Sequence, residues 1–250
     1  MNKLILNKFL FCIALLLNFL VVSVCSNIKV EEKGKNISTI IFDFDGTIAD
    51  TLPLCIKCIN TFAKEYNYAP SNNIEYFRNK TLEDVIKNDL KLHFYQLPSY
   101  GEKLKKMISE QKESIKVFVA INDLITELSK NYKIGIITSN NQEVVETVLE
   151  KSNIKNISFI FSSNDHSTIK KIIYGKSGVI TSFLKKNNLN QDQVLYIGDE
   201  VRDIQACRKA GVKMAAVTWG YNSKELLEKE KPDYLVDKPL EILKILSNRE

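Results

Sequence analysis

Residues 38–47 read Ser-Thr-Ile-Ile-Phe-Asp-Phe-Asp-Gly-Thr, a short apolar run that ends abruptly in two carboxylates and a glycine. The apolar part predicts a buried strand that gives way to a loop at Asp43. Asp43 and Asp45 stand at i and i+2 and therefore point to the same side, and Gly46 permits a sharp turn behind them. Like charges this close repel each other unless a cation is bound. The pattern therefore predicts a hard divalent cation with oxygen ligands, and Mg²⁺ fits best.

Further apolar runs of strand length follow along the chain, and segments of helical period separate most of them. This alternation predicts a Rossmann-like parallel α/β sheet. In such sheets ligands gather beyond the carboxyl ends of the strands, so polar residues that directly follow an apolar run are candidate site residues. The later strands are expected at 133–138, 157–161, 194–197, 214–218 and 234–236, and the candidates are Thr138, Ser139, Ser162, Ser163 and Asp199.

No segment between the first strand and Lys133 reads as a strand, and its periodicity predicts helices instead. Apolar residues in Pro53–Tyr66 keep to one helical face, and Thr81 with Asp84 resembles a capping box that opens a second helix. A third helix is expected at 101–115, and a core helix at 122–130 leads back into the sheet. We therefore predict a small α-helical cap at 53–117, inserted after the first strand into an α/β core at 38–52 and 118–250.

The first 26 residues have a different character. Phe9–Val24 is almost wholly apolar and follows Lys3 and Lys8, which predicts a signal peptide or a membrane anchor over residues 1–26. Ser26 fits a cleavage site, and cleavage and retention both remain open. The protein would then be exported or membrane-associated. The run is short for a span of about 20 residues, and a start codon assigned too early before a cytoplasmic enzyme is the alternative.

The composition excludes some function classes. The chain has 250 residues and a net charge of +5, which is too mild to indicate a nucleic-acid partner. Cys55 and Cys58 form a C-x-x-C, but no second pair accompanies it, which favours ordinary packing on a helix over redox or metal chemistry. The sequence leaves the oligomeric state undetermined.

Four groups of residues resemble the ordered motifs of the haloacid dehalogenase-like superfamily over about residues 38–250. The groups are Asp43-Phe44-Asp45-Gly46-Thr47, Thr138, Lys176, and Gly198-Asp199 followed by Asp203. The run 194–221 is similar to the phosphoglycolate-phosphatase-like branch, whose small helical cap also lies between the first and second motifs. The resemblance implies a Mg²⁺-dependent phosphatase that hydrolyses a small, phosphoglycolate-like phosphomonoester through an aspartyl-phosphate.

The resemblance also implies a role for each motif residue. Asp43 is the nucleophile, and Asp45 is the general acid and then the general base. Asp43, the backbone carbonyl of Asp45, and Asp199 hold the metal ion. The remaining roles are a phosphate hydrogen bond from Thr138, charge neutralisation by Lys176, and orientation of Lys176 or of a metal-bound water by Asp203.

Three assignments have a competing interpretation. Lys176 has other lysines near it, and Ser177 stands where the branch usually has proline, so a solvated surface lysine is the alternative. Ser139 either contacts phosphate or caps the next helix. Arg78 lies where branch members place a substrate-specificity loop, and we expect it to contact the non-reacting part of an anionic substrate; a surface arginine is the alternative. The glycine common in that loop is missing, which puts phosphoglycolate itself in doubt.

The sequence favours a phosphatase over several other functions. Dehalogenases of the superfamily lack a carboxylate at the position of Asp45, so dehalogenation is disfavoured. A phosphomutase acting on a sugar phosphate shares all four motifs and is the runner-up. A receiver-like module needs neither the cap nor Asp45. A non-catalytic phosphate-binding protein would not need the complete catalytic set. The first strand is not followed by the G-x-G-x-x-G of dinucleotide-binding proteins.

Overall fold

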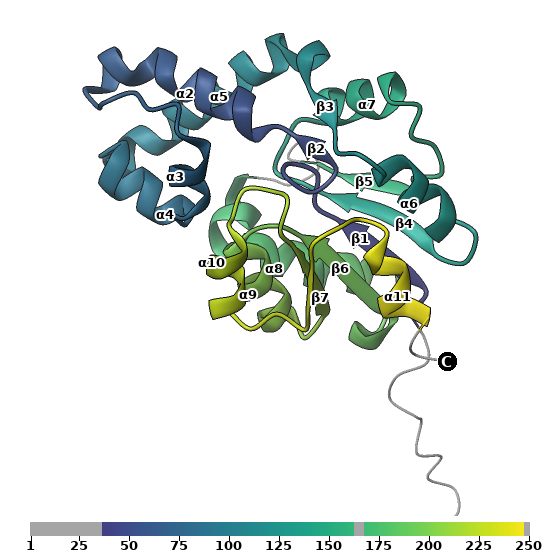
Figure 1. Cartoon of the computed structure of the whole chain (residues 1–250). Helices are drawn as coiled ribbons and strands as arrows, with labels where there is room; N and C mark the ends of the chain where they lie inside the picture. Colours follow the sequence, from purple (N-terminus) through teal and green to yellow (C-terminus); the bar gives the residue numbers. More distant parts are fainter. Residues whose placement is uncertain (1–36, 163–167, 248–250) are drawn as a thin grey trace, which may run out of the picture. The chain divides into compact units, whose positions relative to one another are not determined.

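The computed structural model describes residues 37–162 and 168–247. Within these residues, six parallel strands form one sheet in the order β5-β4-β1-β6-β7-β8, so the first strand lies near its centre (Figure 1). The structure therefore confirms the expected Rossmann-like parallel α/β sheet. The strands are β1 Thr39–Phe42, β4 Lys133–Ile137, β5 Phe159–Phe161, β6 Val194–Gly198, β7 Lys213–Val217 and β8 Tyr234–Val236.

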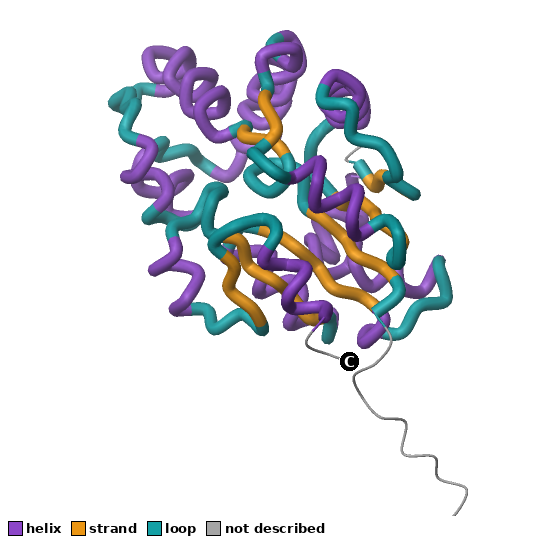
Figure 2. The backbone as a smooth tube through the Cα atoms, turned by 45° about the vertical axis from the view of Figure 1, so that its right-hand side comes forward, coloured by secondary structure: helices purple, strands orange, loops and turns teal. Residues whose placement is uncertain are grey.

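Helices cover both faces of this sheet (Figure 2). Successive residues of β1 point to opposite faces, as in any strand: Ile40 and Phe42 pack into one buried apolar cluster, and Ile41 packs into the other. Strands buried on both faces explain the continuous apolar runs in the sequence. The first cluster is completed by α6 Ile121–Leu128, α7 Gln142–Lys151 and α11 Glu241–Ser247, and the second by α8 Thr168–Lys186, α9 Val201–Ala210 and α10 Lys224–Lys229.

A group of helices lies between β1 and β4 in the sequence, where the cap was predicted (Figure 1). Their apolar residues form a third buried cluster, to which Phe62, Phe77 and Tyr100 contribute rings. Thr81 and Asp84 form the expected capping box. The elements are α2 Leu52–Tyr66, α3 Ile74–Arg78, α4 Leu82–Asp84, the π-helical η1 Val85–Asp89, the 3₁₀ turns η2 Phe94–Gln96 and η3 Lys112–Ser114, and α5 Leu97–Glu110.

Three local expectations were wrong. The insert is not free of strand, because β2 Ala49–Asp50 and β3 Lys116–Val117 pair as a short antiparallel ribbon at its two ends. The helix α3 was not expected, since five residues are too few to show a period. The third cap helix begins at Leu97 rather than at residue 101, because Pro98 fits the first turn of a helix. The domain boundaries at residues 53 and 117 stay a prediction.

The predicted leader at residues 1–26 lies outside the described residues. None of the helices in the described part of the chain combines the length and apolar character that crossing a membrane requires. Cys58 is buried and Cys55 partly buried on α2, and neither takes part in a disulfide within the described residues. This agrees with ordinary packing of the C-x-x-C.

Candidate active site

The site begins where β1 ends. Asp43 is buried directly after the strand, and its backbone N–H donates to the carbonyl of Ile197 on the adjacent β6 at 2.8 Å. One carboxylate oxygen, Oδ1, accepts a hydrogen bond from the Phe44 N–H at 2.8 Å. Gly46 follows with φ of +78°, and a Cβ added there would lie 2.1 Å from Asp199 Oδ2. Only glycine therefore lets this turn pass so close to Asp199.

Asp199 follows β6 and is fully buried. Its Oδ1 accepts from the Thr47 hydroxyl at 2.7 Å, and its Oδ2 accepts from the backbone N–H of Tyr221 at 2.7 Å. Asp203 lies one turn into α9 and is also fully buried. Its Oδ2 accepts from the Glu200 N–H at 3.1 Å, as part of a capping box that begins the helix. Both side chains are therefore held in one orientation.

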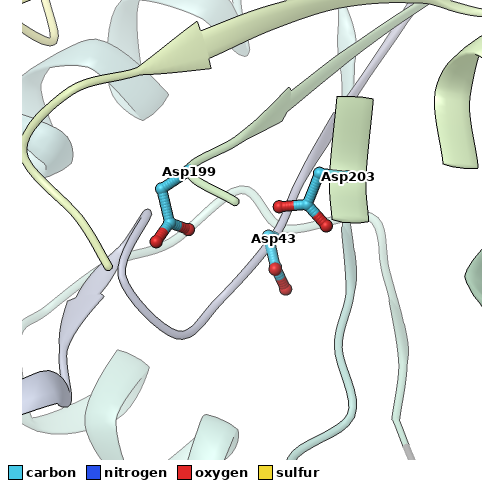
Figure 3. A group of neighbouring side chains, drawn as sticks. All are labelled: Asp43, Asp199 and Asp203. Atoms are coloured by element: carbon cyan, nitrogen blue, oxygen red, sulfur yellow. The ribbon is translucent and has the colours of Figure 1, made fainter. Parts of the chain in front are cut away.

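Asp43, Asp199 and Asp203 lie close together, although they come from the loop after β1, the turn after β6, and α9 (Figure 3). One ligand oxygen from each lies within 4.8 Å of the others. Burial raises the pKa of Asp199 well above its usual range, and the neighbouring carboxylates of Glu200, Asp203 and Asp43 raise it further. Converging carboxylates of this kind are the donor set that a hard cation with oxygen ligands prefers. The residues present therefore fit Mg²⁺.

Lys176 supplies the positive charge beside this group. Its Nζ donates to Asp43 Oδ2 at 2.6 Å and also to Asp203 Oδ1. The α8 helix is interrupted directly before it, at Gly175, where φ is 54° and ψ is −163°. Burial raises the pKa of Asp43 and Lys176 lowers it, with a net value of about 7. The structure thus places Lys176 next to the predicted nucleophile rather than on the surface.

Asp45 lies beside the two polar side chains that follow β4. The Asn140 amide donates to its Oδ1 at 3.0 Å, and the Thr138 hydroxyl lies 3.4 Å from its Oδ2. Burial raises the pKa of Asp45, while hydrogen bonds from Thr51 and Asn140 lower it. The sequence analysis missed Asn140, although its position two residues after Thr138 at a strand end was an available signal. Ser139, between them, is exposed.

Arg78 is placed differently from the sequence expectation. Its Nε donates to the Gly220 carbonyl at 3.0 Å and its Nη2 to the Thr218 carbonyl at 2.5 Å, both in the loop after β7. Its Nη1 donates to Glu75 Oε1 at 3.1 Å. Each guanidinium nitrogen therefore already has a protein acceptor. The expected contact of Arg78 with substrate stays a prediction, and the contacts within the protein join it to the loop after β7.

A cavity of about 570 Å³ lies between α5 and the start of α7. It contains Lys105, whose ammonium forms no hydrogen bond or ion pair with any residue that the structure describes. Burial lowers the pKa of Lys105, and the Asp45 carboxylate is the first of the charges that raise it. Lys105 is therefore a partly buried cation of α5 at this cavity, and the carboxylates of Asp45 and Glu102 favour its charged form. The cavity is lined by Glu102, Lys105, Lys106, Ser109, Glu110, Lys112 and Asn141.

Comparisons with known proteins agree with the fold and the motifs. The family model of haloacid dehalogenase-like hydrolases matches residues 40–217. A phosphoglycolate phosphatase of Synechococcus elongatus is 26% identical over 211 residues, which is 83% of this chain and 96% of that protein. The pyrophosphatase PpaX of Bacillus cereus is 28% identical over 217 residues, covering 85% and 97%. A haloacid dehalogenase-like family protein from Streptococcus pneumoniae superposes with a TM-score of 0.68 at 25% identity, covering 84% and 98%. The resemblance found in the sequence is thereby confirmed.

Proposed function

Because the chain belongs to the haloacid dehalogenase-like hydrolases, we propose that it is a Mg²⁺-dependent phosphatase that acts through an aspartyl-phosphate on Asp43. One observation carries the proposal above all others. The buried Asp43 is paired with Lys176 and lies against two further buried carboxylates, with Asp45 two residues away. A nucleophilic carboxylate, a cation to balance it and a separate carboxyl for proton transfer are the groups that phosphoryl transfer through aspartate requires.

The first chemical step forms a bond between a carboxylate oxygen of Asp43 and phosphorus, and breaks the bond from phosphorus to the leaving oxygen. Asp45 gives its proton to that oxygen, which leaves as an alcohol. Burial favours the protonated form of Asp45 that this step needs. In the second step Asp45 takes a proton from water, the water oxygen bonds to phosphorus, and Asp43 is released together with inorganic phosphate.

Thr138, Asn140 and Lys176 prepare the site for this chemistry. Asn140 holds the Asp45 carboxyl in place, and Lys176 fixes one oxygen of Asp43. Lys176 and the Thr138 hydroxyl then offer donors to the phosphoryl oxygens, where charge develops in the transition state. When bound by Asp43, Asp199 and the backbone carbonyl of Asp45, Mg²⁺ would supply further positive charge next to the transferred group.

We infer that the substrate is a small phosphorylated metabolite with a second anionic group. Phosphoglycolate carries a carboxylate and pyrophosphate a second phosphate, and the two relatives described above are named for these compounds. Lys105 supports this inference, because a partly buried cation at this cavity on the cap would attract the far end of such a substrate.

We also propose that residues 1–26 direct the chain to or across a membrane and contribute nothing to catalysis. Fractionation of cells that express tagged full-length chain or a form lacking residues 1–26 tests this. Full-length chain that stays uncleaved and entirely in the cytosolic fraction would contradict the proposal.

A metal-dependence assay tests the central function. Purified protein should hydrolyse para-nitrophenyl phosphate with Mg²⁺, lose activity on chelation by EDTA, and regain it when Mg²⁺ is added back. Ca²⁺ should inhibit, because its longer bonds and larger ligand number favour binding by both oxygens of Asp43. A panel of phosphorylated metabolites then identifies the substrate. Full turnover in EDTA would refute the metal assignment.

A further inference from the structure

The loop at residues 218–223, which follows β7, forms several hydrogen bonds with the inserted helices. Arg78 donates to the carbonyls of Thr218 and Gly220, as described above, and the Arg78 carbonyl accepts from the Ser223 N–H at 2.7 Å. The Asn222 amide donates to the Lys80 carbonyl at 2.9 Å. The loop thus holds the end of α3 through both its backbone and its side chains.

The same loop determines the surroundings of Asp199. The Tyr221 N–H donates to Asp199 Oδ2 at 2.7 Å, and the Asn222 N–H donates to the Asp199 carbonyl at 3.3 Å. Gly220 packs so closely that an added Cβ would lie 2.3 Å from Asp199 Oδ2. Tyr221 therefore forms a hydrogen bond with the Asp199 carboxylate, while its neighbours Gly220 and Asn222 form hydrogen bonds with the cap.

Tyr221 joins the two regions directly. Its ring packs against the buried apolar cluster of the inserted helices, and its hydroxyl lies 2.9 Å from the Thr51 hydroxyl at the start of α2. Its backbone N–H meanwhile holds Asp199. A shift of the cap relative to the loop would therefore move the donor on which Asp199 Oδ2 depends.

We propose that Arg78 is a positioning residue that, through the loop at 218–223, couples the cap to the orientation of Asp199 and hence to divalent-cation binding. This rests on the proposed function, in which Asp199 is a metal ligand. Arg78 suits the task because its planar fork reaches two backbone carbonyls at once. The guanidinium fixes the loop, the loop fixes Asp199, and a cation then meets a ligand that is already oriented.

The proposal separates metal affinity from substrate affinity. If Arg78 bound substrate, Arg78→Ala would raise KM and leave the metal requirement unchanged. If Arg78 positions Asp199, the same change weakens Mg²⁺ binding, and saturating Mg²⁺ restores most of kcat. Hydrogen bonds that hold a metal ligand in its orientation affect metal affinity by about 10- to 100-fold.

Trp219 provides a readout that does not depend on activity. It is the only tryptophan in the chain and lies in this loop, where its Nε1 donates to the Thr47 carbonyl at 3.1 Å. The Thr47 hydroxyl itself donates to Asp199. Tryptophan fluorescence therefore reports on the loop and on its contact with the turn that holds Asp199.

The test is a titration of the full chain with MgCl₂, followed by Trp219 fluorescence and by calorimetry, for wild type, Arg78→Ala, Arg78→Lys and Glu75→Gln. Lysine keeps the charge but lacks the planar fork of donors, and the Glu75 variant removes only the charge of the exposed partner of Arg78. We expect the Kd for Mg²⁺ to rise about tenfold or more in Arg78→Ala, to rise less in Arg78→Lys, and to stay within about twofold of wild type in Glu75→Gln.

An unchanged Kd for Mg²⁺ in Arg78→Ala, with or without a raised KM, overturns the proposal. Circular dichroism and thermal melting verify that each variant is folded. If Arg78→Ala is not folded, the Kd for Mg²⁺ of Arg78→Lys tests the proposal instead. Wild-type protein that binds Mg²⁺ but hydrolyses no phosphate ester would contradict the proposed function and leave the coupling supported. Active wild-type protein without altered Mg²⁺ binding in the variants would contradict the coupling alone.

Discussion

At the scale of single residues, the state of Asp43 depends on what surrounds it. Burial disfavours its charge, Lys176 favours it, and Asp203, which pairs with the same ammonium, disfavours it. Lys176 therefore binds two carboxylates. If either carboxylate were lost, the ammonium would pair more strongly with the one that remains. In the proposed mechanism this arrangement keeps Asp43 ionised when a cation is present, which is the form that attacks phosphorus.

Asn140 provides a prediction at this scale. Its amide hydrogen bond lowers the pKa of Asp45, so removing it in Asn140→Ala should raise that pKa further. As the general acid, Asp45 would then stay protonated to higher pH. The alkaline limb of the profile of kcat/KM against pH should therefore shift to higher pH. The value of kcat should fall, because the carboxyl group of Asp45 is less well held.

A pH profile with an alkyl phosphate as substrate measures this. Ser139→Ala is the matched control, because that hydroxyl is exposed one residue away. It should leave both limbs where they are. An alkaline limb that does not move in Asn140→Ala would mean that Asp45 is not the group that titrates.

Asp45 has two roles in the proposed mechanism, and Asp45→Ala should separate them. Para-nitrophenolate leaves without help from an acid, so phosphorylation of Asp43 should stay fast, whereas hydrolysis of the aspartyl-phosphate loses its base by about 10²- to 10⁴-fold. Stopped-flow absorbance should show a burst of about one p-nitrophenol per enzyme, followed by slow turnover. Steady turnover at the wild-type rate would contradict the assignment.

At the scale of elements, α5 carries the group assigned to substrate selection. Lys105→Ala should lower kcat/KM for phosphoglycolate or pyrophosphate by about 10- to 100-fold, the effect of a lost hydrogen bond to a charged group. Para-nitrophenyl phosphate has no second anion and should react almost as before. Lys106→Ala, an exposed neighbour at the same cavity, is the control. Equal damage to all substrates would point to a disturbed cap instead.

Much at this scale could be predicted from the sequence. The strand that ends at Asp43 and the one that ends before Asp199 have apolar runs that stop at carboxylates, so both their position and the meeting of their ends followed from parallel sheet geometry. The capping box at Thr81 could also be predicted, because its two residues lie only three positions apart in the sequence.

Other features could not be predicted, because the partners are distant in sequence. Nothing in the spacing of Arg78 indicates that it binds carbonyls 140 and 142 residues further on. The ribbon of β2 and β3 has two residues in each strand, which is too short for any alternation to appear. Lys105 lies among other lysines of α5, and only the fold shows that it is partly buried and lines a cavity beside Asn141.

At the scale of the whole molecule, the carboxylate group links stability, pH and metal. The folded chain raises the pKa of Asp43 from 3.8 to about 7, so between these values the folded state binds more protons than the unfolded state. Stability in the absence of metal should therefore fall as pH rises from about 4 to about 7. Binding of Mg²⁺ to the folded state alone raises stability by mass action.

We therefore expect Mg²⁺ to raise Tm more at about pH 7.5 than at about pH 5.5, where protons compete for the same oxygens. Differential scanning fluorimetry with and without MgCl₂ measures this. Asp199→Asn removes one ligand charge and should reduce the effect at both pH values. A Tm that responds equally to Mg²⁺ at both pH values, in wild type and variant alike, would show that the ion binds elsewhere.

The account depends most directly on Asp43, and one substitution tests it. Asp43→Asn keeps the shape of the side chain but replaces the carboxylate with an amide, which is a poor nucleophile. With saturating Mg²⁺ and para-nitrophenyl phosphate, the variant should be folded and its kcat lower by about a thousandfold or more, a loss of about 4 kcal/mol of transition-state stabilisation. Turnover within about tenfold of wild type, in protein free of contaminating phosphatase, would contradict the assignment of Asp43 as the nucleophile.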